Sequence, residues 1–294
     1  MKRDLELSKK CFEQQRIVFS KLSKLTLCRK KDMNKKTVAA LKDWFSGYVQ
    51  TFKSVDDDLE QNTVMKEEHT ERVCGEILNI GEKLGLNNED LCLAEIVALF
   101  HDIGRFEQYA RHRTFVDLHS VNHAEHGVKI LQENGVLNGL DHSTRDLILR
   151  IISYHNRAFL PQKETEHCLF FTKLLRDADK LDIWRVVTDY YRREDGKRNN
   201  AIELGLPDTP GISDDTYNDL IEGKIVEVTH LKNLNDFKLL QIGWIYDINF
   251  TPTFQRIKER RYIEMIRDVL PESKEIEEIF SVVQSYLNEQ IKDV

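Results

Sequence analysis

The chain has 294 residues, of which 40% are hydrophobic and 32% are charged, and its formal net charge is −7. This length allows one large domain or two small ones with a sizeable core, and the composition is typical of a globular protein. The negative charge argues against nucleic-acid binding as the main function. The sequence has neither a secretion signal nor an apolar run of about 18 residues, so we expect a cytoplasmic protein without a membrane span.

Helical periodicity dominates the chain, and few glycines and prolines interrupt it, so we predict an all-α fold. Residues 1–36 carry twelve Lys or Arg against four Asp or Glu and are interpreted as a basic N-terminal extension. Residues 37–192 are expected to form the core domain, and residues 193–294 a helical region packed on it.

The expected helices of the core domain lie at about 37–54, 66–84, 89–102, 119–134, 144–157 and 166–192. A loop that contains Arg105, Phe106, Arg111 and Arg113 is expected after the third of them. A section rich in Gly, Pro, Asp and Asn at about 194–214 predicts a loop or lid. Further helices are expected at about 214–223, 232–247, 252–269 and 272–291.

The dipeptide His101-Asp102 ends an apolar run, residues 94–100, that belongs in a core. An isolated buried carboxylate costs several kcal/mol or takes up a proton. Asp102 therefore needs either an ion-pair partner or a metal ion. A helix end at Gly104 would be the ordinary explanation of the dipeptide.

Other helices direct the same residue types towards the core. His69, His123, His155 and Asp179 each lie on the apolar face of a predicted helix. Singly, each has an ordinary explanation: a hydrogen-bonded core histidine, or a pair of Asp179 with Arg176 or Lys180. Together, four His and two Asp favour a metal site, and a donor set without thiolate suits Fe, Mn, Co, Ni, Zn or Mg. The five cysteines are scattered without a C-x-x-C pair, which argues against a thiolate zinc site or a disulfide framework.

His69, His101-Asp102 and Asp179 follow one another as H…HD…D, which resembles the signature of the HD-domain superfamily of metal-dependent phosphohydrolases. The resemblance covers about residues 66–185, and its matching segments are 66–70, 100–106 and 176–182. It implies an all-α HD-domain helical bundle with additional C-terminal helices and with metal between the helices.

The resemblance also implies a ligand set for one or two divalent ions. His69, His101, Asp102 and Asp179 would be the first ligands, with Asp102 as a bridge. His123 resembles a histidine of the H-x-x-x-G element of two-metal members, and His155 resembles the first histidine of their His-His pair. His126 remains an alternative to His123. Asn156 stands where the second histidine of that pair would be, which leaves a third ion open. Asp177 and Asp182 are expected to pair with nearby basic groups.

The resulting hypothesis is hydrolysis of a phosphomonoester or phosphodiester, most readily of a nucleotide, by metal-activated water. Asp102 and Lys180 are the candidate catalytic residues, and Lys180, Arg105, Lys66 and Arg157 are the candidate phosphate-binding cations. Two alternatives are kept: a mixed-valent di-iron oxygenase on the same scaffold, and a non-catalytic metal-dependent nucleotide sensor. The expected partner is a small phosphorylated molecule. The C-terminal helices could also form an interface between copies of the chain.

Overall fold

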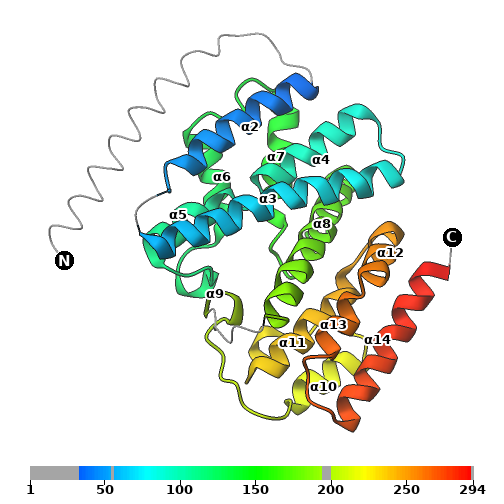
Figure 1. Ribbon diagram of the computed structural model, residues 1–294. Helices are drawn as coiled ribbons and strands as arrows, with labels where there is room; N and C mark the ends of the chain where they lie inside the picture. The colour runs from blue at the N-terminus through cyan, green and yellow to red at the C-terminus, as the bar shows by residue number, and fades with distance from the viewer. Residues whose placement is uncertain (1–32, 54–55, 194–199, 293–294) are drawn as a thin grey trace. The chain divides into compact units, whose positions relative to one another are not determined.

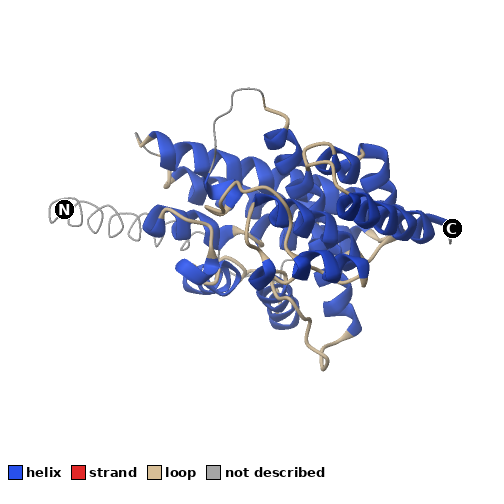
Figure 2. Cartoon of the chain, turned by 90° about the horizontal axis from the view of Figure 1, so that it is seen from below, coloured by secondary structure: helices blue, strands red, loops and turns tan. Residues whose placement is uncertain are grey.

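The computed structural model describes residues 33–53, 56–193 and 200–292. Every regular element in these ranges is a helix, and Figure 2 shows no strand among them (Figures 1 and 2). The all-α prediction is therefore confirmed. Residues 1–32, most of the predicted basic extension, lie outside the described residues, and the proposed division at residues 36 and 192 stays a prediction.

The helices follow one another along the chain in this order. The first part of the chain contains α2 (Lys35–Gln50), α3 (Asp57–Lys83), α4 (Asn88–Phe100), α5 (Ile103–His112), the 3₁₀ helix η2 (Asp117–His119), α6 (His123–Glu133), α7 (His142–Tyr154) and α8 (Glu166–Tyr191). The later part contains α9 (Asn200–Glu203), α10 (Asp214–Ile221), η3 (Val228–His230), α11 (Leu234–Gly243), η4 (Trp244–Asp247), α12 (Thr251–Arg260), α13 (Tyr262–Arg267) and α14 (Lys274–Lys292).

Three expectations are corrected. The predicted loop after His101-Asp102 is the helix α5, whose side chains at 103, 106 and 109 are buried at helical spacing. Helix α3 begins at Asp57 instead of near residue 66, with three acidic residues in its first turn that favour a helix start. The helix expected at 252–269 is interrupted at Arg261, whose φ of 58° lies in the left-handed region.

The described chain divides into two compact units, and the boundary falls inside α3 and α8. The first unit comprises residues up to Glu71 and residues 87–172. Its central element is α4, whose residues 96–100 are all buried and which contacts α2 and α7. Helix α5 contacts α6, and α6 contacts α7. Ring contacts of Phe45 with Phe100 and Phe106 join α2, α4 and α5.

Two glycines explain why α5 and α6 approach so closely. A Cβ atom on Gly104 would lie 2.2 Å from the carbonyl oxygen of His123 and 2.8 Å from the amide nitrogen of Gly127. A Cβ atom on Gly127 would in turn lie 3.0 Å from the Ile103 side chain. A Cβ does not fit at position 104, where the contacts are with backbone atoms, whereas at position 127 the Ile103 side chain would have to shift. Gly104 therefore determines how near the start of α6 lies to the start of α5.

The second unit comprises residues 72–86 and the chain from Lys173 onwards. Helix α14 contacts α10 and α12, and α11 contacts α10 and α13. The fully buried Trp184 of α8 donates its indole N–H to the carbonyl oxygen of Gln241 at 2.9 Å and stacks on Tyr262. In the described residues of the chain, we find no helix with the length and hydropathy that a membrane crossing requires.

Candidate metal centre

The site is built around the junction of α4 and α5. His101 is the C-cap residue that directly follows α4, and Asp102 is the residue that precedes α5. Aspartate at such a position usually accepts a hydrogen bond from a backbone N–H of the new helix. The Asp102 side chain makes no such bond, although it is 96% buried. Its carboxylate is therefore directed to other partners in the core.

Each carboxylate oxygen of Asp102 faces a different pair of histidines. Oδ2 lies 3.6 Å from Nε2 of His69 and 3.7 Å from Nε2 of His101. Oδ1 lies 3.3 Å from Nε2 of His123 and 3.8 Å from Nε2 of His155. We call the first group subsite A and the second group subsite B. All five residues belong to the first unit and all are buried.

Three of these rings have their Nδ1 atoms occupied. In each of them, Nδ1 lies 2.7 Å from an oxygen atom. The partner of His101 is the Ala98 carbonyl oxygen, that of His155 is the Ile152 carbonyl oxygen, and that of His123 is Oδ2 of Asp117. Carbonyl and carboxylate oxygens only accept, so in each ring Nδ1 donates. Burial and the nearby Arg105 lower the pKa of His123 to about 3, so this ring is neutral near pH 7. A neutral ring that donates through Nδ1 presents the lone pair of Nε2 to the site.

This donor set fits a divalent metal ion. In subsite B, one ligand atom from each of Asp102, His123 and His155 lies within 4.8 Å of the others. The Nε2 atoms of the two rings are 3.0 Å apart. Two imidazoles bound at about 2.1 Å and at right angles on one ion would have roughly this separation. The donors are imidazole and carboxylate, which suits several divalent metals and does not identify one.

A lysine balances the charge of the central carboxylate. Nζ of Lys66 lies 2.7 Å from Oδ2 of Asp102 and 5.3 Å from the centre of the Phe115 ring. Burial raises the pKa of Asp102, but Lys66 and His101 beside it hold that pKa well below the ordinary value. Asp102 is therefore ionised and available as a ligand near neutral pH.

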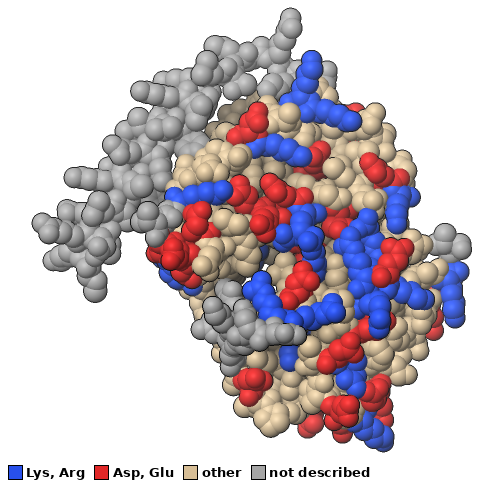
Figure 3. All heavy atoms as spheres, in the orientation of Figure 1, with Lys and Arg blue, Asp and Glu red and all other residues tan. Residues whose placement is uncertain are grey.

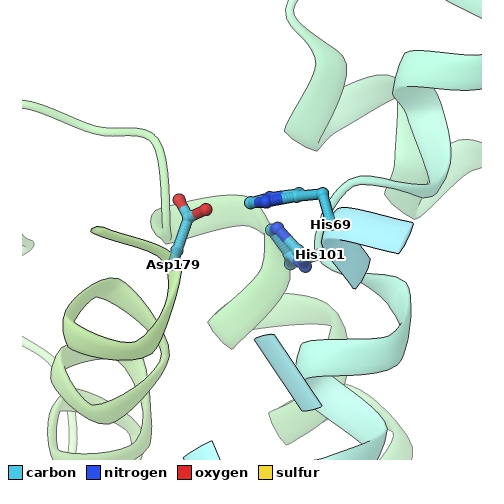
Figure 4. A group of neighbouring side chains, drawn as sticks. All are labelled: His69, His101 and Asp179. Atoms are coloured by element: carbon cyan, nitrogen blue, oxygen red, sulfur yellow. The ribbon is translucent and has the colours of Figure 1, made fainter. Parts of the chain in front are cut away.

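Asp179 is the remaining member of the predicted ligand set. It follows the buried Phe171 and Leu175 at helical spacing on α8, in the part of that helix that belongs to the second unit. Figure 4 draws the carboxylate of Asp179 together with the rings of His69 and His101. The residue is half-buried, so its side chain continues the apolar face of α8 as the sequence pattern indicated.

His123, and not its rival His126, lies beside Asp102. Nε2 of His126 lies 2.7 Å from Oε2 of Glu107 on α5. The ring of His126 is thus directed to the carboxylate of Glu107. The structure thus brings His123 to the other histidines and directs His126 elsewhere.

The predicted phosphate-binding cations have different environments. An NH1 atom of Arg105 donates to Oε1 of Gln108 and Oδ1 of Asp117, each at 2.9 Å, and to the Phe115 carbonyl oxygen. Arg157 is exposed, with its guanidinium 4.8 Å from the centre of the Tyr154 ring. Two of these cations pair with the central carboxylate: Lys66 lies 2.7 Å from Oδ2 of Asp102, and Nε of Arg105 lies 3.5 Å from Oδ1.

In the second unit, Lys180 and Arg176 both donate to Oδ2 of Asp247, at 2.6 Å and 2.5 Å. Burial and the neighbouring Arg176 lower the pKa of Lys180, although it is paired with Asp247. Asp182 forms the predicted pair with a basic group, Arg72. Asp177 instead accepts hydrogen bonds from the backbone N–H groups of residues 249 and 250.

Sequence reasoning did not identify Asp117 or the role of Asn156. Oδ2 of Asp117 accepts from Nδ1 of His123 at 2.7 Å and from Nδ2 of Asn156 at 3.2 Å. Burial raises the pKa of Asp117, but His123 and Arg105 lower it, and the net result is a pKa well below the ordinary value. Asp117 lies in the short 3₁₀ helix η2, where no apolar periodicity marks a face, so the pattern carried no signal for it.

Comparison with protein families matches residues 67–184 to the HD domain. The matched segment contains all six predicted metal ligands: His69, His101, Asp102, His123, His155 and Asp179. Searches of curated proteins and of solved structures found no match. The family match, the all-α fold and the His/Asp clusters confirm the resemblance seen in the sequence. The chain therefore contains an HD domain, the defining domain of a superfamily that consists mostly of metal-dependent hydrolases.

Proposed function

We propose that this protein is a phosphohydrolase that uses two divalent metal ions to cleave a phosphomonoester or phosphodiester. The observation that carries the proposal is the position of Asp102, each of whose carboxylate oxygens faces its own pair of histidines. We assign one ion to subsite A and the other ion to subsite B. The sequence resemblance alone adds Asp179 as a further candidate ligand. Asp102 would then be a ligand of both ions through its single carboxylate.

When bound, a pair of divalent ions activates water at neutral pH and stabilises the charge of a phosphoryl group. Helices α3 and α6 carry His69 and His123, and His101 and His155 directly follow α4 and α7. Backbone carbonyls orient the rings of His101 and His155, so rigid elements fix the ligand geometry. Lys66 now donates to an oxygen of Asp102 that we assign to a metal ion. If that oxygen binds an ion, the ammonium group of Lys66 is free of Asp102 and can donate to a phosphate oxygen instead. Lys180 remains a second candidate for this role.

We propose a nucleotide as the substrate class. The most exposed large apolar side chains among the described residues are Phe159, at 89%, and Leu118, at 88%. They follow His155 and Asp117 closely in sequence, and the bond between Asn156 and Asp117 joins the two segments that carry them. An exposed aromatic face beside a phosphate site can stack on a base. Figure 3 shows acidic side chains among the basic ones on the face it displays, which supports a small substrate over nucleic acid.

The test is elemental analysis of protein purified without oxygen, followed by a screen for phosphate release with the metal found. We expect release from nucleotides in the absence of oxygen, and we expect Asp102→Ala to lose both the bound metal and the activity. Oxygen consumption with a mixed-valent iron EPR signal would favour the oxygenase instead. Tight nucleotide binding without product under Fe, Mn, Co and Ni would favour the sensor.

Phe159→Ala tests the substrate class separately. Loss of a stacking contact of about 1–3 kcal/mol should raise KM for the nucleotide roughly 5-fold to 150-fold and leave the metal content unchanged. Val228→Ala is the matched control, because Val228 is also highly exposed, at 63%, but belongs to the second unit. An unchanged KM in the Phe159 variant would remove base stacking on this residue from the proposal.

A further inference from the structure

We propose that Asp117 is a positioning residue that holds the ligands of subsite B in their metal-binding form. The inference rests on the assignment of an ion to subsite B. It concerns a residue that lies outside the H…HD…H…H…D pattern and that would not touch the ion.

Asp117 accepts hydrogen bonds from α5, from α6 and from the residue segment just beyond α7. Its Oδ2 accepts from His123 on α6 at 2.7 Å and from Asn156, just beyond α7, at 3.2 Å. Its Oδ1 accepts from Arg105 and Gln108 on α5, both at 2.9 Å. Each oxygen therefore takes two donors, and a single side chain links α5, α6 and the end of α7 around subsite B.

The bond to His123 has a direct chemical consequence. A carboxylate only accepts, so it keeps the proton of the His123 ring on Nδ1 and leaves the lone pair on Nε2. That Nε2 atom is 3.3 Å from Oδ1 of Asp102 and 3.0 Å from Nε2 of His155. Without Asp117, nothing described in the first unit specifies this tautomer of His123.

Asp117 also acts on the bridging carboxylate through Arg105. While NH1 of Arg105 donates to Asp117, Nε of the same guanidinium lies 3.5 Å from Oδ1 of Asp102. Asn156 adds a further link, because it donates both to Asp117 and to Oδ1 of Asn122 at 3.1 Å. Asn122 in turn caps the N-terminus of α6, the helix that begins with His123. Asp117 thus orients two of the three ligands of subsite B.

The isosteric variant Asp117→Asn isolates this role. An amide replaces one acceptor oxygen by an NH₂ group, which would face two donors whichever way it turns. The variant therefore keeps the volume of the side chain and loses the acceptor pattern. Asp141→Asn is the matched control: Asp141 caps α7 in the same unit, and asparagine is an equally good cap.

Calorimetric titration of metal-free protein with Mn²⁺ and NMR of ¹⁵N-labelled histidine are the two measurements. We expect the Asp117→Asn variant to bind one ion with unchanged affinity and the other 10-fold to 100-fold more weakly, which is the usual effect of losing the partner of a metal-bound histidine. We also expect the His123 ring of the metal-free variant to lose its preference for the proton on Nδ1. The Asp141→Asn variant should match the wild type in both measurements.

The two hypotheses fail in different ways. Wild-type protein that binds only one ion would contradict the two-ion proposal, and the NMR measurement on metal-free protein would still decide the role of Asp117. Two ions bound with wild-type affinity by Asp117→Asn, or an unchanged His123 tautomer, would overturn the inference. An equal loss of affinity for both ions would also overturn the inference, because the effect would then not be specific to subsite B.

Discussion

Gly104→Ala is a sharp test of how the fold positions the candidate site. The added Cβ would lie 2.2 Å from the His123 carbonyl oxygen, whereas ordinary contacts begin near 3.4 Å. The first turn of α6 would have to move by roughly 1 Å, and overpacking of this kind costs about 1–3 kcal/mol. The higher helix propensity of alanine would offset about 0.5–1 kcal/mol of this cost.

The same displacement acts on the chemistry, because His123 is the first residue of α6. A shift of about 1 Å in a catalytic group can cost roughly 100-fold in rate. We therefore expect Gly104→Ala to lower the free energy of unfolding by about 1–2 kcal/mol and to weaken one of the two metal ions. Urea unfolding and calorimetric metal titration measure the two effects independently.

Gly47→Ala is the control for this prediction. Gly47 lies on the exposed side of α2, and a Cβ there would meet no atom within 4 Å. This variant should gain about 0.5–1 kcal/mol of stability from helix propensity and leave metal binding unchanged. Wild-type stability together with wild-type affinity for both ions in Gly104→Ala would refute the close-contact argument.

The remaining predictions use the same assays. His123→Ala should lose one of two bound ions, whereas His126→Ala should keep both, because His126 contacts Glu107; the reverse result would move the ligand. Lys180→Ala should raise KM or lower kcat at unchanged metal content, and unaltered kinetics would remove it from the phosphate site. Burial raises the pKa of Glu107, but His126 and Arg111 bring it below the ordinary value. The ionised Glu107 side chain therefore stabilises the fold at a pH above the ordinary glutamate pKa, and this stabilisation is lost as the pH falls through the lowered pKa of the folded protein. Glu107→Gln should flatten that acid dependence in urea unfolding, and an unchanged slope would contradict the assignment. Chelation should lower the free energy of unfolding by about 2.7 kcal/mol relative to protein at an ion concentration 100 times Kd, as checked by scanning calorimetry, and an unchanged transition would contradict metal binding.

Helical periodicity was sufficient for the all-α class and for the location of most helices. It failed where local chemistry interrupts the pattern. The several arginines after Asp102 favour a loop in the sequence, but burial of Phe106 and Tyr109 makes this segment the helix α5. Arg261 adopts a left-handed conformation that no side chain of this type signals in advance, so the break between α12 and α13 was missed.

Spacing along single helices was sufficient to show which residue types share the apolar faces, because a position on such a face depends only on the local repeat. This was enough to name His69, His101, Asp102, His123, His155 and Asp179 as candidates, and to match the HD domain. How these residues pair became visible only in the folded chain, because pairing depends on contacts between helices. It placed one oxygen of Asp102 against each pair of histidines and directed His126 to Glu107. It also supplied Asp117, which lies on no periodic face and becomes a partner of His123 only when η2 folds against α6.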